Sequence, residues 1–545
     1  MYKILVLDDI APEGIALLEA ADDFQHEIRT ELSGEDLRQA LASCDGAICR
    51  SGVTIGEQQL ADNKQLKAIV RAGVGTDNID KAAATRAGIV VMNTPAGNTF
   101  STAEHTFTLM LAISRNVAAA YQSLLEGSWD RTSHMGSQLA HKTLGIVGIG
   151  RIGKEVARRA IAFEMKIIGV DPFLSQEQAE KLGIELVTSL EEMLPRIDYL
   201  TVHTPLTEET HNLISHEQIA AMKPGARLIN CARGGIYDEE ALADGLESGQ
   251  LAGVALDVFS QEPCTENRLF GMPGVICTPH LGATTREAQT QVSQEAVELL
   301  VNFLQTGEIR HAVNMVSIDL ATLASLSGFL DLAHRLGLFA SQWSAGGVAS
   351  CRIDYRGEVA NLDTRLLTAS LAAGLLERVL HADVNIVNSQ LLLQERGIEL
   401  VEQKQLEKDD FNSSITAQLE SDGNVHTVAG TLFGNNMPRL IRLGDYRLET
   451  YLDGVMLVFS HGDVPGIIGW VGSILGEAHV NIAQMSVGRA GDTPGGQAIG
   501  VLNLDAVPPT ETLEKLEDHE DIHRVQVIQL PAAGELPEWL RHSLQ

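Results

Sequence analysis

Cysteine is scarce in this 545-residue chain, and what there is does not form a recognisable metal or redox motif. The six cysteines include no Cys-x-x-Cys pair and no Cys/His cluster with the spacing of a zinc site. We interpret them as reduced thiols, which are typical of cytosolic proteins. The sequence therefore predicts a cytoplasmic protein that carries no metal.

Positive charge is also in short supply. Lys and Arg number 40 against 72 Asp and Glu, which gives a formal net charge of −32. Such a surface repels nucleic acid and anionic membranes, because binding a phosphate backbone requires a positive patch. An anionic ligand would need arginines that overcome this field locally. We therefore expect no nucleic-acid partner.

No apolar run is long enough to span a bilayer. The most apolar late stretch, residues 320–343, is interrupted by Asp331, His334 and Arg335. A spanning helix needs about 20 predominantly apolar residues, so no membrane association is expected.

The chain does contain enough apolar residues for several cores, since 44% of it is hydrophobic. At about 150 residues per domain, this length predicts three or four domains. Short apolar strands alternate with amphipathic helices in two successive series, which is typical of two doubly wound, Rossmann-like α/β domains. The expected strands are 3–8, 46–50, 66–72 and 89–93, then 143–148, 166–170, 199–203, 227–230, 253–257 and 275–278.

Between the two series of strands, Ser101 and Glu104 have the spacing of a capping box, which predicts that a long helix begins there. The chain after residue 316 has a different pattern. Residues 317–450 combine helical runs with β-rich segments and contain no chemical motif. Residues 453–530 read strand, helix, strand, strand, helix, strand, which predicts a βαββαβ ferredoxin-like domain.

A glycine-rich turn joins a strand to a helix at residues 144–160. Its Gly-x-Gly-x-x-Gly pattern is followed by Asp171 at the end of the next strand, 23 residues after Gly148. This is the dinucleotide-binding fingerprint, in which the glycines permit the tight turn and the close approach of the pyrophosphate. A carboxylate at Asp171 would accept hydrogen bonds from ribose and repel a 2′-phosphate, so the pattern predicts NAD rather than NADP. The expected contacts in the turn are Gly148, Gly150, Arg151, Ile152 and Gly153.

Arg233, Glu262 and His280 each follow a predicted strand, on the side where open α/β sheets bind ligands. A guanidinium can hold a substrate carboxylate and polarise the neighbouring carbonyl through its planar fork. Histidine is the usual proton acceptor near neutral pH, and a carboxylate beside it fixes its tautomer and favours the imidazolium. These residues predict a hydroxy-acid dehydrogenase. Arg50 and Arg71, just past strands of the first series, are candidates for binding a substrate phosphate.

As a set, five segments resemble the D-isomer-specific 2-hydroxyacid dehydrogenase family; they are residues 71–80, 143–153, 231–242, 253–259 and 278–285. The resemblance implies an NAD domain inserted into a substrate domain, with the active site in the cleft. It implies an Arg–Glu–His catalytic set, here Arg233, Glu262 and His280. It also implies nicotinamide-side contacts at Thr76, Thr204, Cys231, Ala232 and Asp257.

The length of the chain resembles that of long family members, which add an α+β intervening domain and a C-terminal ACT domain. The expected limits are 1–98 with 286–316 for the substrate domain, 99–285 for the NAD domain, 317–451, 453–530, and a tail at 531–545. In serine-regulated relatives, serine binds between two ACT domains. The corresponding positions here are His461, Asp463 and Asn481, although some relatives carry Asn in place of Asp463. A purely architectural ACT module is the alternative.

The resemblance implies oxidation of 3-phospho-D-glycerate to 3-phosphooxypyruvate, the first step of serine synthesis, by a homodimer or homotetramer. The expected substrate-binding residues are Arg50, Ser51, Arg71, Gly73 and Arg131, the last in a loop that relatives use across the dimer interface. Two alternatives stay open: a glyoxylate or hydroxypyruvate reductase, and a non-catalytic sensor of NAD or an amino acid. Formate dehydrogenases carry Gln where Glu262 stands, which disfavours that activity.

Overall fold

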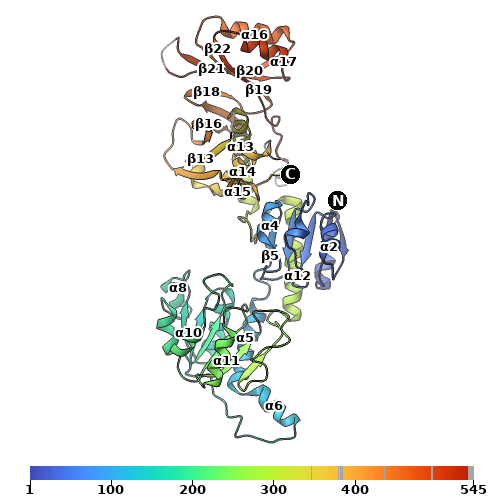
Figure 1. Cartoon of the computed structure of the whole chain (residues 1–545), viewed down its shortest axis with the longest axis vertical. Coiled ribbons are helices and arrows are strands. Elements are labelled where there is room, and N and C mark those ends of the chain that lie inside the picture. The colour runs from blue at the N-terminus through green and yellow to red at the C-terminus, as the bar shows by residue number, and fades with distance from the viewer. Residues whose placement is uncertain are drawn as a thin grey trace. The chain divides into compact units, whose positions relative to one another are not determined.

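The computed structural model describes residues 1–344, 347–378, 380, 384–421, 423–434, 436–491 and 495–537. Tertiary contacts divide the chain into two units (Figure 1). The first contains Met1–Asp9, Ile15–Asn93 and the residues from Ala296 onward, and the second contains Ile10–Gly14 and Thr94–Glu295. The second unit is thus inserted into the first. The exact domain limits expected from the sequence stay a prediction, and residues 538–545 of the expected tail lie outside the described residues.

The first unit begins with a parallel sheet in the order β2-β1-β3-β4-β5, a doubly wound arrangement. Its strands are β1 (Tyr2–Val6), β2 (Phe24–Ile28), β3 (Gly46–Cys49), β4 (Ala68–Arg71) and β5 (Val90–Asn93). The helices of this unit are α2 (Gly34–Leu41), α3 (Glu57–Leu60) and α4 (Lys81–Arg86). Two more helices, α1 (Pro12–Glu19) and α12 (Arg286–Thr306), have residues in both units. The sequence did not predict β2, because only Phe24 of this edge strand is buried and an apolar run is absent.

The inserted unit is built on a parallel seven-stranded sheet in the order β12-β11-β10-β9-β6-β7-β8. Its strands are β6 (Thr143–Val147), β7 (Lys166–Val170), β8 (Glu185–Leu186), β9 (Tyr199–Val202), β10 (Ala226–Asn230), β11 (Leu251–Leu256) and β12 (Val275–Cys277). Its helices are α5 (Thr99–Ser114), α6 (Val117–Leu125), α7 (Arg151–Ala162), α8 (Gln176–Lys181), α9 (Leu190–Met193), η1 (Leu194–Arg196), α10 (His216–Ala221) and α11 (Glu239–Glu247). The strand order reverses between β6 and β9, and ligands bind at such a switch point.

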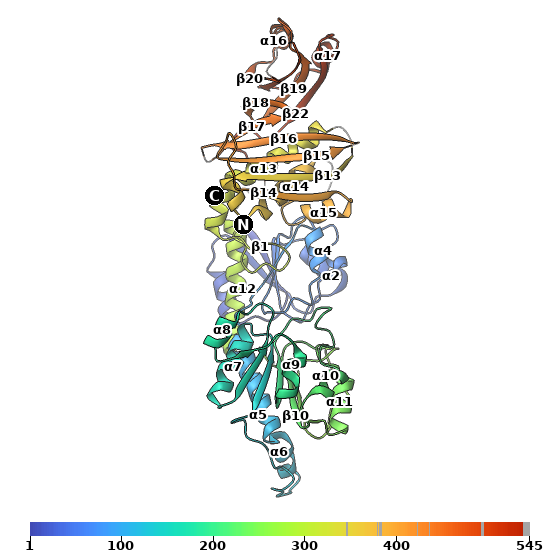
Figure 2. The ribbon, with the colours of Figure 1, turned by 90° about the vertical axis from the view of Figure 1, so that its left-hand side faces the viewer.

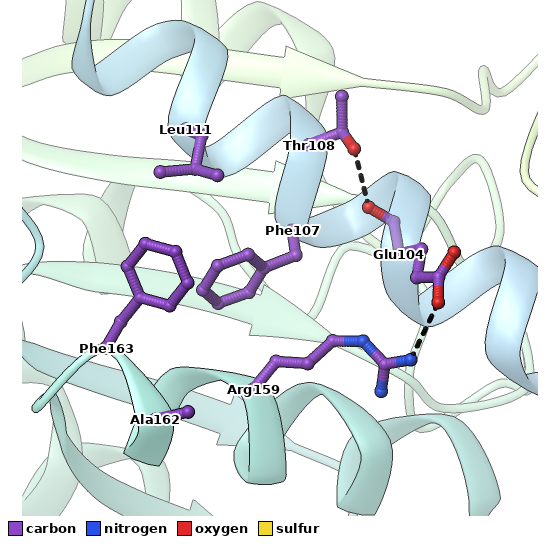
Figure 3. Close-up of a pocket in the computed structure, with 7 residues that line it drawn as sticks. All are labelled: Glu104, Phe107, Thr108, Leu111, Arg159, Ala162 and Phe163. Atoms are coloured by element: carbon purple, nitrogen blue, oxygen red, sulfur yellow. Dashed lines mark hydrogen bonds and ion pairs between the residues drawn. The ribbon is translucent and has the colours of Figure 1, made fainter.

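The predicted capping box at Ser101 is wrong. The helix α5 begins two residues earlier, at Thr99, after Asn98. The hydroxyl of Ser101 donates instead to the carbonyl of Gly282 at 2.8 Å. Glu104 forms an ion pair with Arg159 of α7 at 3.0 Å (Figure 3). That pair lies at a pocket lined by Glu104, Phe107, Thr108, Leu111, Arg159, Ala162 and Phe163.

The intervening segment forms a six-stranded mixed sheet in the order β14-β13-β15-β16-β17-β18, with α13 and α14 on one face (Figure 2). Gly337 and Gly374 let those two helices touch, since a Cβ on either would lie 2.1 Å from a carbonyl oxygen of the other helix. None of the helices in the described ranges combines the length and the apolarity needed to cross a membrane. The elements are α13 (Leu320–Trp343), β13 (Val348–Gly357), η2 (Glu358–Asn361), α14 (Thr364–Glu377), α15 (Ser389–Glu395), β14 (Glu399–Gln405), β15 (Ser413–Ser421), β16 (Asn424–Phe433), β17 (Met437–Leu443) and β18 (Tyr446–Tyr451).

The C-terminal segment has the predicted βαββαβ order and an antiparallel sheet ordered β20-β21-β19-β22. One face of this sheet and its two helices share a core that includes Leu457, Val471, Leu502 and Leu516. The elements are β19 (Val455–Gly462), α16 (Ile467–Glu477), β20 (Ile482–Arg489), β21 (Gln497–Leu504), α17 (Thr510–Glu517) and β22 (Ile522–Gln529).

Candidate active site

The glycine turn lies between β6 and α7, at the switch point of the sheet. Gly148 has a φ of +87°, and a Cβ there would lie 2.6 Å from the carbonyl oxygen of His203, so only glycine fits. A Cβ on Gly153 would lie 2.2 Å from the carbonyl oxygen of Gly148. The absence of a side chain at Gly153 therefore lets the first turn of α7 pack closely against the glycine turn. Beside Gly150 nothing lies within 4 Å, so the backbone there is open to an approaching phosphate.

Asp171 and Thr204 both follow this turn in sequence and contact it in the fold. One oxygen of Asp171 accepts the amide of Ile149 at 2.7 Å, and the other accepts the amide of Phe173 at 2.8 Å. Thr204 contacts Gly148 closely enough that a Cβ on that glycine would lie 2.9 Å from its methyl group. The buried hydroxyl of Thr204 has no hydrogen-bond partner among the described residues. An open glycine turn with an unsatisfied hydroxyl beside it fits a dinucleotide.

Arg233 follows β10 and is held by its neighbours. Its Nη1 donates to the carbonyl of Ala232 at 2.7 Å, and the amide nitrogen of Asn230 donates to the Arg233 carbonyl at 2.8 Å. Gly234 packs so tightly on the next loop that a Cβ would lie 1.8 Å from the carbonyl oxygen of Phe259. Glycine at this position therefore brings the loop of Arg233 against the loop that carries Glu262.

The structure brings Glu262 and His280 together. Nδ1 of His280 lies 2.7 Å from Oε2 of Glu262, while Oε1 accepts the amide of Phe259 at 3.0 Å. Burial raises the pKa of Glu262, but the hydrogen bonds from His280 and from the Phe259 amide outweigh it and lower the pKa overall. Glu262 is therefore a carboxylate at neutral pH, the form that stabilises a protonated imidazole.

The other expected cofactor contacts are spread over both units. Cys231 is buried, and burial raises the pKa of its thiol to about 12, so it is no nucleophile. Ala232 lies beside it, with its amide bonded to Asn230 at 2.9 Å. Asp257 is fully buried at the end of β11. Thr76 is buried in the first unit, where its carbonyl accepts the amide of Ile79 at 3.1 Å.

Arg50 and Arg71 lie at the carboxyl ends of neighbouring strands, because β3 pairs with β4 in parallel. Nη1 of Arg50 donates to the carbonyl of Asp9 at 3.1 Å, and Ser51 is exposed next to it. Gly73 has a φ of +146°, and a Cβ there would lie 1.6 Å from Nη1 of Arg71. The predicted pair Arg71 and Gly73 is thus in direct contact.

Arg131 lies in the exposed segment after α6. Its neighbour Asp130 accepts the amides of Thr132 and Ser133 at 2.9 and 3.1 Å, which shapes the turn. Arg131 belongs to the inserted unit, whereas Arg50 and Arg71 belong to the first unit.

The three expected effector residues have separate partners. His461 is buried, and its Nδ1 lies 2.7 Å from the carbonyl of Gly462. Asp463 pairs with Arg489 at 2.8 Å; a hydrogen bond from the amide of Gly495 and the Arg489 contact lower its pKa. Asn481 donates to Asp505 at 2.8 Å.

Sequence reasoning missed three residues that support these sites. Asn230 orients the Arg233 loop, and Asn78 donates to the carbonyls of Arg50 and Val53, both at 2.7 Å. His105 of α5 contacts Asp257 at 3.1 Å. Asn78 stands inside a segment that carries the family resemblance and Asn230 directly precedes another, which was the available signal. A single histidine in a helix gave none.

Comparison with protein families divides the chain in the same order. Residues 107–282 match the NAD binding domain of D-isomer specific 2-hydroxyacid dehydrogenases. Residues 325–444 match the D-3-phosphoglycerate dehydrogenase intervening domain, and residues 455–521 match the ACT domain.

Similar proteins extend over almost the whole chain. A D-3-phosphoglycerate dehydrogenase of Methanocaldococcus jannaschii is 40% identical over 530 residues, which is 97% of this chain and all of the relative. One of Bacillus subtilis is 39% identical over 531 residues, again 97% of this chain and all of the relative. Among solved structures, a glyoxylate reductase from Paecilomyes thermophila is 30% identical with a TM-score of 0.52, and covers 57% of this chain and 98% of its own. The chain therefore belongs to the D-3-phosphoglycerate dehydrogenases, within the D-isomer-specific 2-hydroxyacid dehydrogenase family.

Proposed function

We propose that this chain oxidises 3-phospho-D-glycerate to 3-phosphooxypyruvate with NAD, the first step of L-serine synthesis. The hydrogen bond between Glu262 and His280 is the observation that carries the chemistry. The full-length similarity to D-3-phosphoglycerate dehydrogenases supports 3-phospho-D-glycerate as the substrate.

The proposed roles follow from charge and position. NAD supplies the acceptor for the hydride that leaves C2 of the substrate. His280 accepts the proton of the C2 hydroxyl, and Glu262 stabilises the imidazolium that forms. Arg233 holds the substrate carboxylate through its planar fork and polarises the carbonyl in the reverse reaction.

The substrate phosphate is assigned to Arg50 and Arg71, with Ser51 and Gly73 as neighbours. A phosphorylated acid approaches a chain of net charge −32, so local guanidinium groups must make the field favourable where it binds. A reductase for glyoxylate or hydroxypyruvate would need no such pair. Catalysis, rather than sensing alone, is supported by the intact Arg233, Glu262 and His280 set.

Product identity tests the proposal. Purified protein is incubated with NAD and 3-phospho-D-glycerate, hydrazine traps the keto product, and mass spectrometry identifies the adduct. We expect NADH to form together with the hydrazone of 3-phosphooxypyruvate. NADH formed from D-glycerate but not from the phosphorylated acid would contradict the proposed substrate.

We also propose that the active species is a homo-oligomer. Helix α6 buries none of its residues, and it exposes Val117, Tyr121, Leu124 and Leu125, followed by Trp129. An apolar patch of this kind is typical of an interface, and a second copy of the chain is the proposed cover, with Arg131 reaching the partner's substrate. Light scattering is expected to give a dimer or tetramer; a monomeric mass for active protein would contradict this.

Regulation by L-serine at the ACT domain is a further proposal, with His461, Asp463 and Asn481 as the binding residues. Calorimetry with L-serine, compared with D-serine, tests it. We expect heat of binding with L-serine only, and no heat with either would leave the ACT domain an architectural module. A cytoplasmic location is proposed because all six cysteines are free thiols.

A further inference from the structure

The segment Thr278–Gly282 carries His280 in an unusual backbone conformation. His280 has a φ of +56°, in the left-handed region that a residue with a side chain seldom occupies. Such a conformation persists only where its surroundings fix it. The fixing group here is Asp257, at the end of β11.

Asp257 binds the segment with both its side chain and its main chain. Oδ1 accepts the amide of Leu281 at 2.7 Å and the hydroxyl of Thr278 at 2.6 Å, and Oδ2 accepts the amide of Gly282 at 2.8 Å. The carbonyl of Asp257 accepts the amide of His280 itself at 2.9 Å. Hydrogen bonds to one buried residue, Asp257, therefore hold the chain on both sides of the proposed base, His280.

His105 of helix α5 completes this arrangement. Its Nε2 lies 3.1 Å from Oδ1 of Asp257 and 3.0 Å from the hydroxyl oxygen of Thr278. Because the Thr278 hydroxyl donates to Asp257, the Nε2–H of His105 is the remaining side-chain donor to this carboxylate. Burial raises the pKa of Asp257, but the hydrogen bonds from His105 and Thr278 lower it overall, so it stays ionised.

The same face of α5 holds the segment at a second point. Ser101 and Thr102, one turn before His105, both donate to the carbonyl of Gly282, at 2.8 and 3.2 Å. Residues four apart on a helix share a face, so Ser101 and His105 act on the same target. This explains why Ser101 does not cap α5.

A metal site is the alternative for these groups, because ligand atoms of His105, Cys231 and Asp257 lie within 4.8 Å of one another. The hydrogen bonds and the protonation state of these three side chains argue against a metal. Nε2 of His105 and Oδ1 of Asp257 are engaged with each other, and burial raises the pKa of the Cys231 thiol to about 12, so it is protonated. A protonated thiol is no metal ligand.

We propose that His105 is a positioning residue: by donating to Asp257 it keeps the Thr278–Gly282 segment, and with it His280, in the geometry that proton transfer requires. His105 itself touches neither substrate nor the reacting atoms. The inference rests on the proposed function, since it assigns the proton transfer to His280.

Two substitutions at one position separate positioning from packing. His105→Gln keeps an N–H at about the reach of Nε2, whereas His105→Leu keeps the bulk and removes the donor. Thr108→Ala, on the exposed side of the same helix, is the matched control, because its hydroxyl only donates to the Glu104 carbonyl. Thr278→Val removes the other side-chain donor to Asp257 and serves if His105→Leu does not fold.

We expect His105→Leu to lower kcat about 10- to 100-fold, since small misplacements of a catalytic group cost rates of this order. The KM for 3-phosphooxypyruvate and the Kd of NADH, measured by fluorescence, should change less than about 3-fold because Arg233 and the glycine turn are untouched. His105→Gln should recover most of the rate, and Thr108→Ala should behave as wild type.

Three results would overturn the inference: a wild-type kcat in His105→Leu, equal damage in His105→Gln, or a loss that appears only in NADH binding. Binding of Zn²⁺ to the wild type but not to His105→Leu, seen by calorimetry, would also overturn it in favour of a metal site. If the wild type reduces glyoxylate but not 3-phosphooxypyruvate, the proposed substrate fails, and the same variants are then compared on glyoxylate.

Discussion

Nδ1 of His280 lies 2.7 Å from Oε2 of Glu262, and this pair joins two loops that are 18 residues apart in sequence. When Nδ1 carries the proton donated to the carboxylate, Nε2 is left with the lone pair that can accept a proton. The hydrogen bond thus selects the tautomer that acts as a base. The carboxylate also favours the charged form that follows proton transfer.

Replacing His280 with Ala should lower kcat by about 100- to 10,000-fold, the range that one general base contributes. His141→Ala is the control, because His141 is exposed and precedes β6, whereas the glycine turn follows that strand. Steady-state rates with saturating NADH and substrate measure the effect. A His280→Ala enzyme with a kcat like the wild type would contradict the assignment.

Replacing Glu262 with Gln should move the pH dependence of oxidation. Glu262 has a lowered pKa and is therefore charged across the working range. Without its charge the imidazolium is less stable, so the neutral base persists to lower pH and the acid limb of the kcat/KM profile shifts to lower pH. The reductive direction needs the protonated imidazole. Its rate should therefore begin to fall at a lower pH in Glu262→Gln than in the wild type. A profile unchanged in both directions would refute the role of Glu262.

Arg50→Gln and Arg71→Gln should each discriminate between substrates. Loss of a charged hydrogen bond to phosphate should lower kcat/KM for 3-phosphooxypyruvate about 10- to 100-fold. With hydroxypyruvate as substrate, the same variants should have nearly the kcat/KM of the wild type, because hydroxypyruvate has no phosphate. Arg29→Gln is the control, because Arg29 is a half-exposed residue after β2 that is not assigned to the site. Equal losses on both substrates would indicate damage to the fold rather than a phosphate site.

Asp171→Asn should change the choice of cofactor. The amide oxygen can still accept the Ile149 amide, so the glycine turn keeps its main contact, but the charge that repels a 2′-phosphate is gone. We expect kcat/KM for NADH to fall about 10-fold and that for NADPH to rise, which narrows their ratio. The ratio of the two constants is the measurement. An unaltered ratio would show that another residue selects NAD.

The sequence predicted those parts of the fold that depend on local patterns. Buried parallel strands such as β7 and β10 appear as apolar runs, and the glycine turn is a local motif, so both were found. The edge strand β2 is mostly polar and was missed. The start of α5 was misplaced because Ser101 is bonded to Gly282, 181 residues away, and no local pattern encodes that contact.

The candidate site shows the same division. Arg233 and His280 stand after strands inside recognisable segments, and Glu262 stands in the loop that follows another. His105 lies in a helix, and its role becomes apparent only from its contacts with Asp257 and Thr278, which are far away in sequence. The three effector residues were placed by resemblance, and the pairing of Asp463 with Arg489 could not be expected from spacing.

The most direct test compares two substrates that differ only by the phosphate. NADH oxidation is followed with 3-phosphooxypyruvate and with hydroxypyruvate, in the reductive direction because oxidation of the alcohol is uphill. We predict a kcat/KM at least about 100-fold higher for the phosphorylated acid, because hydroxypyruvate has no phosphate for Arg50 and Arg71 to bind. Equal or faster turnover of hydroxypyruvate would contradict the account and identify a reductase.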